Sequence, residues 1–364
     1  MIVEWILRGL AVLTATVSLL PLIKVPHGAI RGLAFPRQQI FWLCLFLLVA
    51  ALWAGAPVWV TAVFGGCMCL QSIYIAKFTP LWRRQSVRAD DALQADNRRH
   101  ISVLTANVKM SNRDYPRLIH LTQRVSPDLL IAIETDQPWC AALSEALADD
   151  YPHRIDLPQD NGYGMQVFSR LTLGEVETRC LLTDGVPSIR CTVTLRSGAL
   201  VRLYVLHPEP PVAFHDTKGR DGEIALTGMQ VAQDPLPCIV TGDLNDVAWS
   251  TTTRRFQRLS GLADPRVGRG FYNTFNAFHW WARWPLDHLF HDPLFQLLTM
   301  QRLPKIGSDH FPLLFALALG HAPQRVDQLE EACPDETAEA VEMIREERDR
   351  DRRPIGDDWE EKAE

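Results

Sequence analysis

The longest stretch without a charged side chain runs from Gln38 to Ala76. A helix needs about 20 apolar residues to cross a bilayer, so this stretch is too long for one span. It breaks at Ala54-Gly55-Ala56-Pro57, where glycine and proline favour a turn. The stretch therefore predicts two apolar helices joined by a short turn, which constrains the N-terminal third of the chain more than any other feature.

A third apolar segment precedes this hairpin, because Gly9 to Ile23 also lacks charge. We predict three transmembrane helices at about residues 4–23, 39–55 and 58–76, within a membrane region 1–82. Tryptophans lie near the proposed ends, where aromatic rings favour the membrane interface: Trp5, Trp42, Trp53, Trp59 and Trp82. The alternative is a cleaved signal peptide at residues 1–34, although the later hairpin would still hold the protein in the membrane.

The cations beside the three segments predict their orientation. Three lie between the first two segments and four follow the third, whereas the opposite side has only Arg8; the seven are Lys24, Arg31, Arg37, Lys77, Arg83, Arg84 and Arg88. Positive residues favour the cytoplasmic side. We therefore expect a multi-pass protein of the inner (cytoplasmic) membrane with its C-terminal part in the cytoplasm. The eight cysteines have no paired metal-site spacing, which fits free thiols in a reducing compartment.

Charged side chains are distributed unevenly along the chain. Residues 1–99 contain ten basic and four acidic side chains, whereas residues 321–364 contain seven basic and sixteen acidic ones. The block between them is slightly acidic, which argues against broad binding of duplex DNA. We expect a linker at 83–100, one domain at 101–320 and an acidic tail at 321–364 that is disordered or forms a solvated helix.

Residues 101–320 have the pattern of an α/β domain rich in strands. Strand-like runs are predicted at 101–105, 128–133, 164–169, 174–181, 189–195, 200–206, 237–241 and 313–319, and helical spacing at 115–124, 138–147 and 217–231. Strands outnumber helices, and hairpins fit the middle of the domain better than βαβ units. The pattern predicts an α/β sandwich of two packed sheets with helices outside.

Polar side chains stand at the ends of several apolar strands. They are Asn107, Glu134, His207, Asp243 with Asn245, Asp287 with His288, and Ser308-Asp309-His310. Each one alone is commonly a cap or a turn residue. Their joint occurrence at separate strand ends predicts one site, because α/β proteins place their sites where strands end.

These pieces resemble the endonuclease/exonuclease/phosphatase superfamily, which includes deoxyribonucleases, apurinic endonucleases, inositol-polyphosphate phosphatases and sphingomyelinases. The matching segments follow the family's order: 104–108, 133–135, 162–170, 206–208, 241–246, 284–287 and 307–312. Gly242-Asp-Leu-Asn245 and Ser308-Asp-His310 are the most specific. The resemblance implies a four-layer α/β sandwich and metal-dependent hydrolysis of a phosphoester.

The resemblance also implies roles for the residues. Glu134 would be the leading ligand of a divalent cation, with Asn107 beside it and Asp309 completing the site. Asp243 would orient or deprotonate the attacking water, since a carboxylate can accept its proton.

The remaining roles concern the phosphate and the leaving group. Asn107 and Asn245 would donate amide hydrogen bonds to the phosphate. His310, oriented and charged by Asp287, would hold it as an imidazolium. His207 would be the acid for the leaving oxygen.

One position departs from the family pattern. Some members place a second acid two residues after the first asparagine, where this chain has Lys109. A single Mg²⁺ (or Mn²⁺) is therefore expected rather than two.

Two further clusters have alternative interpretations. Aromatic residues crowd the segment before Asp287, either as a packed loop or as an apolar rim for bases or lipid headgroups: Phe271, Tyr272, Phe275, Phe278, Trp280, Trp281 and Trp284. Arginines follow the Asp243 motif, either as a solvated helix face or as a contact for phosphate or anionic lipid: Arg254, Arg255, Arg258, Arg266 and Arg269.

Three functions follow from these patterns. The first is a membrane-anchored, metal-dependent nuclease or phosphatase, and the second is a lipid phosphodiesterase of sphingomyelinase type. The third is a non-catalytic membrane protein that binds a partner. The expected partners are a phosphoester (nucleic acid, lipid headgroup or small molecule) and the membrane, with no obligate protein partner.

Overall fold

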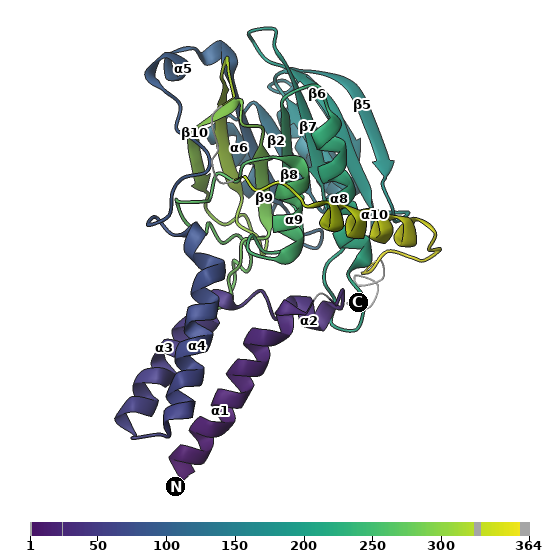
Figure 1. The fold of residues 1–364 in the computed structure, drawn as a ribbon. Coiled ribbons are helices and arrows are strands. Elements are labelled where there is room, and N and C mark those ends of the chain that lie inside the picture. The colour runs from purple at the N-terminus through teal and green to yellow at the C-terminus, as the bar shows by residue number, and fades with distance from the viewer. Residues whose placement is uncertain (1, 24, 324–328, 357–364) are drawn as a thin grey trace.

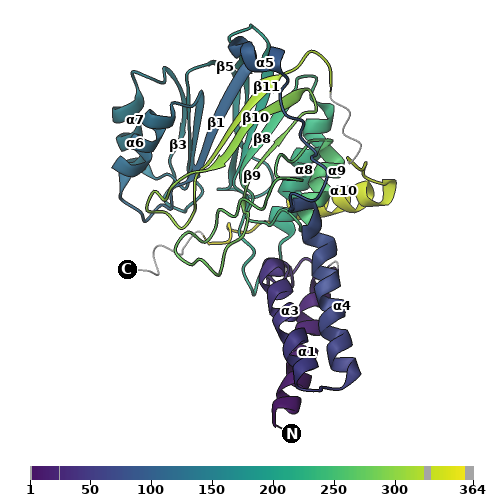
Figure 2. The ribbon, with the colours of Figure 1, turned by 90° about the vertical axis from the view of Figure 1, so that its left-hand side faces the viewer.

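The structure is a computed structural model that describes residues 2–23, 25–323 and 329–356 (Figure 1). Three apolar helices project as a stalk from a sandwich of two β-sheets (Figures 1 and 2). The stalk consists of α1 (Ile2–Leu19), α3 (Arg37–Trp53) and α4 (Val58–Ile75), and the short α2 (Gly28–Gly32) lies between it and the sandwich. The helices lie close to the three segments expected from the sequence.

Length and composition suit two helical segments for membrane insertion. Ile2–Leu22 and Val58–Phe78 are each long and apolar enough to cross a bilayer, and α3 is a shorter apolar helix. A polar network joins all three near the sandwich. Arg37 donates to Gln71 Oε1 (2.8 Å), and the Gln71 amide donates to Ser18 Oγ (2.9 Å). Because these groups are buried, their hydrogen bonds fix the register of the helices.

The two sheets are mixed. The first has the order β10-β11-β1-β2-β4-β3, and its strands are β1 (His100–Asn107), β2 (Leu129–Ile133), β3 (His153–Leu157), β4 (Met165–Ser169), β10 (Phe295–Arg302) and β11 (Leu313–Leu319). The second has the order β5-β6-β7-β8-β9, and its strands are β5 (Thr172–Cys180), β6 (Pro187–Thr194), β7 (Leu200–Leu206), β8 (Cys238–Asp243) and β9 (Asp287–His291).

Helices cover the outer faces of both sheets. Helices α6 (Tyr115–Val125) and α7 (Gln137–Leu147) lie on the first sheet, and α8 (Lys218–Gln233) and α9 (Thr251–Ser260) on the second. Aliphatic side chains from the inner faces, such as Val103, Ile131 and Leu203, form the core between the sheets. The predicted four-layer α/β sandwich is thereby confirmed. Strands β3, β9 and β10 were not expected as elements, and helix α9 was considered only as one interpretation of the arginine cluster.

The segment expected as a linker packs on the sandwich instead. It contains the short α5 (Asp91–Ala95), and Ala89 and Leu93 pack against Ala318 of β11. Gln85 is buried, and its side-chain oxygen accepts the Asp264 N–H (2.8 Å). A segment with a polar, mixed-charge composition can therefore pack on the surface of the sandwich.

The described part of the predicted acidic tail forms a helix that is exposed along most of its length and packs on the domain through one face. Within its described part, α10 (Pro334–Arg348) packs on α8 through Ala340 and Ile344, so it is neither disordered nor solvated on all sides. Two arginines of the basic cluster explain the docking, because Arg258 pairs with Glu336 and Arg255 with Glu339. Residues 324–328 and 357–364 of the predicted tail lie outside the described residues.

Candidate active site

Six strands bring the predicted site residues to one edge of the sandwich. Asn107 and Glu134 stand at the C-terminal ends of the parallel strands β1 and β2, and His207 and Asp243 at those of β7 and β8. The antiparallel neighbours β9 and β11 begin at that edge, where they bring Asp287 and His310. A cavity of about 390 Å³ opens there, lined by Glu134, Asn245, Asp309 and His310 among others.

Gly242 lets β7 and β8 approach closely just before Asp243. A Cβ atom at this position would lie 1.9 Å from Leu206 O, and the backbone φ is +144°. Both conditions favour glycine over any residue with a side chain. The Gly-Asp motif is thus a steric requirement for placing the Asp243 carboxylate in the cavity wall.

Asn107 holds two carboxylates in place. Its amide nitrogen donates to Glu134 Oε1 (2.6 Å) and to Asp243 Oδ2 (3.0 Å), while its oxygen accepts the Lys109 N–H (2.9 Å). Both amide hydrogens are therefore used within the site. The predicted contacts of Asn107 with phosphate and with a metal stay predictions.

His310 is clamped between two carboxylates. Its Nδ1 donates to Asp287 Oδ2 (2.7 Å), and its Nε2 lies 3.5 Å from Asp243 Oδ2. Burial lowers the pKa of His310, but the charges of Asp287 and Asp243 outweigh burial and raise it to about 10. The imidazole therefore carries a positive charge at neutral pH. The Asp287 N–H is itself held by Thr274 Oγ1 (3.2 Å).

His207 behaves in the opposite way. Burial lowers its pKa to about 4, so the ring is neutral at pH 7. Its Nε2 lies 4.0 Å from Glu134 Oε1, and its buried Nδ1 has no hydrogen-bond partner among the described residues. Among the described residues no carboxylate forms a hydrogen bond with this ring, and its predicted role with the leaving group stays a prediction.

Asn245 is fixed mainly through local contacts. Its N–H donates to Asp243 Oδ1 (2.9 Å) and its side-chain amide donates to Pro208 O (2.9 Å). The backbone φ of +50° is sterically unusual but tolerated by asparagine. Asn245 lines the cavity and orients Asp243, while its contact with phosphate stays a prediction.

The donor groups around Glu134 fit a divalent cation. One ligand atom each from Glu134, His207 and Asp243 lie within 4.8 Å of one another. Within the described part of the chain, Glu134 Oε2 receives only a long contact from the Met110 N–H (3.4 Å), which leaves it available as a ligand. Hard cations such as Mg²⁺ prefer carboxylate oxygens. Burial raises the pKa of Glu134 to about 7 despite the hydrogen bond from Asn107, and a bound cation would reverse this shift.

Asp309 lies on the cavity but has a different neighbour. Its Oδ2 accepts from Lys109 Nζ (3.1 Å), the residue that replaces the second acid of some family members. Lys109 thus places a positive charge beside the cavity, and the expectation of one metal ion stays a prediction. The predicted role of Asp309 as a ligand stays a prediction.

Sequence reasoning missed several residues of the cavity wall. Tyr163 and Phe275 lie beside the two histidines, with ring centroids 5.4 Å from His207 and 5.0 Å from His310. Both belong to segments that the sequence had marked, one in a family motif and one in the aromatic segment. Phe35 and the tail residues Ile355 and Gly356 also line the cavity, and no pattern in the sequence indicated them.

The protein is an α/β sandwich with carboxylates and imidazoles gathered at one edge. A model of the Endonuclease/Exonuclease/phosphatase family matches residues 104–310, and the chain belongs to this family. The membership supports hydrolysis of a phosphoester bond. No curated protein matches the chain significantly.

Solved structures show the same fold at low identity. An endonuclease/exonuclease/phosphatase from Beutenbergia cavernae aligns with a TM-score of 0.50 and 20% identity over 62% of this chain and 73% of its own. TDP2 from D. rerio, complexed with a single-strand DNA product, aligns with a TM-score of 0.50 and 17% identity over 60% and 98%. The human Nocturnin catalytic domain, with bound sulfate, aligns with a TM-score of 0.50 and 16% identity over 62% and 95%.

Proposed function

We propose that the protein is a membrane-anchored, metal-dependent phosphoesterase that cleaves a phosphodiester or phosphomonoester by attack of water. The observation that carries the proposal is the chain Asp243–His310–Asp287 beside Glu134 on one cavity. A purely binding domain would have no need for two buried carboxylates around a charged imidazole, because burying them costs free energy. This argues against the non-catalytic alternative.

Asp243 is placed to accept the proton of the attacking water. Hydrogen bonds from Asn107 and from the Asn245 N–H hold its two oxygens in a fixed direction. Burial raises the pKa of Asp243, which strengthens the carboxylate as a base. The water oxygen forms the new bond to phosphorus, its proton passes to Asp243, and the bond from phosphorus to the leaving oxygen breaks.

His310 supplies positive charge to the phosphate. Its Nε2 lies 3.5 Å from Asp243 Oδ2, longer than a good hydrogen bond, so its N–H remains available to a phosphate oxygen. Because the groups are preorganised by Asp287, little reorganisation is needed as charge develops. A divalent cation held by Glu134 would neutralise phosphate charge and polarise the phosphorus centre.

The test is hydrolysis by the full-length protein in detergent. The panel contains single-stranded DNA, duplex DNA, RNA, phosphoinositides and sphingomyelin, each with Mg²⁺ or Mn²⁺ and with excess EDTA. We expect one class to be cleaved only with metal and not by the Asp243→Asn variant. Cleavage of every substrate at the same rate by Asp243→Asn, or full activity in EDTA, would contradict the proposal.

A lipid phosphodiesterase is the second candidate, and the position of the stalk favours it. Phe35, two residues before α3, lines the catalytic cavity. A ring series of Phe35, Trp284 and Phe275 leads to His310, with centroid distances of 6.0, 5.9 and 5.0 Å. If α3 enters a bilayer, the catalytic cavity lies close to the bilayer surface.

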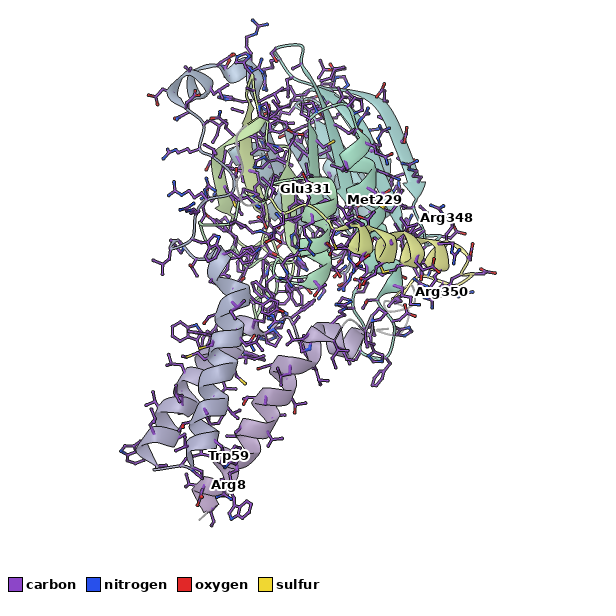
Figure 3. All side chains as sticks on the ribbon, viewed as in Figure 1. Arg8, Trp59, Met229, Glu331, Arg348 and Arg350 are labelled. Atoms are coloured by element: carbon purple, nitrogen blue, oxygen red, sulfur yellow. The ribbon has the colours of Figure 1, made fainter. Side chains whose placement is uncertain are left out.

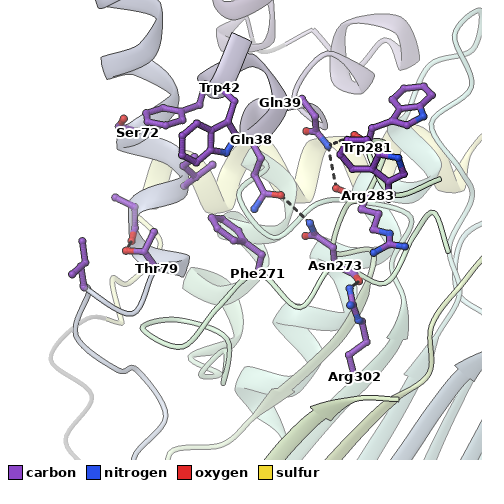
Figure 4. A pocket seen from close by; sticks show the side chains of 15 residues that line it. Gln38, Gln39, Trp42, Ser72, Thr79, Phe271, Asn273, Trp281, Arg283 and Arg302 are labelled. Atoms are coloured by element: carbon purple, nitrogen blue, oxygen red, sulfur yellow. Dashed lines mark hydrogen bonds between the residues drawn. The ribbon is translucent and has the colours of Figure 1, made fainter. Parts of the chain in front are cut away.

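A separate apolar pocket supports the same candidate. It has a volume of about 930 Å³ and lies between the start of α3, the end of α4 and the aromatic segment (Figure 4). Gln39 ties α3 to this segment through the carbonyls of Trp281 (3.1 Å) and Arg283 (3.4 Å). Trp280 is 80% exposed beside it, a position suited to the headgroup layer.

The two candidates respond differently to loss of the exposed ring. With vesicle-borne sphingomyelin or phosphoinositide, we expect Trp280→Ala to lower kcat/KM by about tenfold, as for a lost interfacial anchor. Hydrolysis of soluble bis(4-nitrophenyl) phosphate would stay unchanged. Equal rates for Trp280→Ala and wild type on both substrates would favour the nuclease or phosphatase.

A further inference from the structure

The C-terminal tail returns to the catalytic cavity after α10. Arg348 and Arg350 mark the point where the chain leaves the helix (Figure 3). Ile355 and Gly356 then line the cavity that contains Glu134, Asp243 and His310. A segment outside the family-matched residues 104–310 thus forms part of the wall of the site.

Arg352 anchors this segment in a buried ionic network. Its guanidinium donates twice to Glu209, at 2.6 Å each, and its Nε donates to Glu347 Oε1 (2.8 Å). The side chains of Glu209 and Glu347 are only 2% and 1% exposed. The packing is tight, because a Cβ atom on Gly219 would lie 2.1 Å from Glu209 Oε2 and 2.3 Å from the Arg352 guanidinium.

The backbone of Ile355 completes the attachment. Its N–H donates to Glu209 Oε1 (2.8 Å), and its carbonyl accepts from the Tyr163 hydroxyl (2.5 Å). Glu209 follows His207 by two residues, and the Tyr163 ring lies beside the His207 ring. The tail is therefore hydrogen-bonded to Glu209, which is close to His207 in the sequence, and to Tyr163, whose ring lies beside the His207 ring.

We propose that residues 349–356 form a strap that closes one end of the catalytic cavity and restricts the substrate to a compact phosphoester. This proposal rests on the proposed phosphoesterase activity and names its substrate class. A polymer that continued past the scissile phosphate would have to pass through the space that Ile355 and Gly356 line. The strap therefore favours a small phosphoester or the terminal group of a longer one.

The test compares the wild type with a chain that ends at Asp349, both full-length at the N-terminus and in detergent. Ending there keeps α10, whose Ala340 and Ile344 pack on α8, and removes Arg352, Ile355 and Gly356 together. Arg352→Ala is the second variant. Arg345→Ala is the matched control, because Arg345 is exposed and pairs only with Glu342 of its own helix among the described residues.

Two measurements distinguish an effect of the strap on substrate access from an effect on the activity, and a third reports on the strap itself. The first is kcat/KM for bis(4-nitrophenyl) phosphate and for a 12-residue single-stranded oligonucleotide, with Mg²⁺. The second is binding of a phosphorothioate oligonucleotide of the same length by fluorescence anisotropy, which needs no turnover. Hydrogen exchange of the Ile355 amide reports whether Arg352→Ala releases the strap.

We expect the shortened chain and Arg352→Ala to bind and cleave the oligonucleotide about tenfold better or more, a difference of about 1.4 kcal/mol. The rate on the compact ester would change little, and Arg345→Ala would match the wild type. Unchanged oligonucleotide binding by the shortened chain would overturn the strap. Absence of hydrolysis of both esters by every form, together with no hydrolysis of any substrate of the panel above, would overturn the proposed function, while the binding result would still decide the strap.

Discussion

At the residue scale, burial and neighbouring charge set the behaviour of the site. The two histidines of the cavity have the same imidazole side chain but differ in charge at neutral pH. Carboxylates surround His310 and raise its pKa, whereas burial is the main influence on His207 and lowers its pKa. The same desolvation raises the pKa values of Glu134 and Asp243. Such opposed shifts on one cavity are typical of catalytic sites.

The first prediction concerns the metal. Glu134→Gln removes the leading anionic ligand, so we expect activity to fall by ~10²-fold or more. Because a ligand that binds only the folded state stabilises it, Mg²⁺ should raise the Tm of the wild type but not of the variant. The control is Glu145→Gln, since Glu145 is exposed on α7. An equal Mg²⁺-dependent rise of Tm in Glu134→Gln would remove Glu134 from the metal site.

The second prediction concerns the base and the phosphate clamp. Asp243→Asn and His310→Ala should each lower kcat/KM by at least ~10²-fold. Because the two groups act in one transition state, the double variant should be little worse than the less active single variant. Kinetics of all three, with circular dichroism to confirm folding, provide the test. Asp243→Asn with more than about a third of wild-type activity, well inside the ~10²-fold expectation, would exclude Asp243 as the base.

The third prediction is a pH dependence of stability in EDTA. The pKa of His310 is raised to about 10, so the folded protein holds this proton more tightly than the unfolded chain. Its contribution is fully present below about pH 6.5, the usual histidine pKa, and is lost as the pH rises towards 10. The difference in unfolding free energy between wild type and His310→Gln should therefore shrink over this range. A difference that grows with pH would contradict the ion pair.

The positions of the site residues were the part of the site that sequence reasoning predicted most fully, whereas their chemical roles stay predictions. Asn107, Glu134, His207, Asp243, Asp287 and His310 all reach one edge of the sandwich. The resemblance implied the pairing of His310 with Asp287, which the structure shows. Other hydrogen bonds, such as Lys109–Asp309 and Asn107–Asp243, could not be predicted, because they join residues distant in the chain. The pairing of β1 with β11 brings the first two residues together, and the packing of the two sheets brings the second two together.

At the element scale, the strand that carries Asp243 depends on one glycine. We expect Gly242→Ala to destabilise the fold by at least ~2 kcal/mol, because its methyl group would collide with Leu206 O and the φ is unfavourable. Activity should be lost with the displacement of Asp243. The control is Gly174→Ala in β5, where an added Cβ meets nothing within 4 Å. Chemical denaturation of both variants provides the measurement, and equal stabilities would refute the steric argument.

Elements with weak patterns were the ones that sequence reasoning missed. Strand β3 (His153–Leu157) has a single buried residue, and β9 (Asp287–His291) is fully buried although it contains two histidines. The alternation of β3 covers only five residues, and the sequence of β9 is neither alternating nor continuously apolar. Helix α10 was misjudged for another reason. Its charge density indicated a solvated helix, whereas its acidic residues meet arginines of α9 that are 78 or more positions earlier.

At the scale of the whole molecule, the loop between α1 and α3 lies on the sandwich. The Gly28 N–H donates to His215 O (2.8 Å) and the Thr217 N–H to Pro26 O (2.9 Å). This arrangement agrees with three spans, which put that loop and the C-terminal part on the same side. The membrane side itself stays a prediction.

The fifth prediction tests that side. By the positive-inside rule, a C-terminal fluorescent-protein fusion should be bright in a bacterial host, and an alkaline-phosphatase fusion at the same position should be inactive. A fusion in the turn at Gly55 should give the reverse pattern. An active C-terminal phosphatase fusion would place residues 83–364 outside the cytoplasm and would contradict the cation count.

The contacts between the stalk and the sandwich have a practical consequence for producing the enzyme. Trp249 is buried, and its indole N–H donates to Ala34 O (2.7 Å), while Phe78 and Val267 share its apolar cluster. A fragment cut at residue 100, the natural choice from the family match, would uncover Trp249 and Val267 to solvent. Such a patch favours aggregation, so expression trials should retain residues 25–99 even where solubility is the goal.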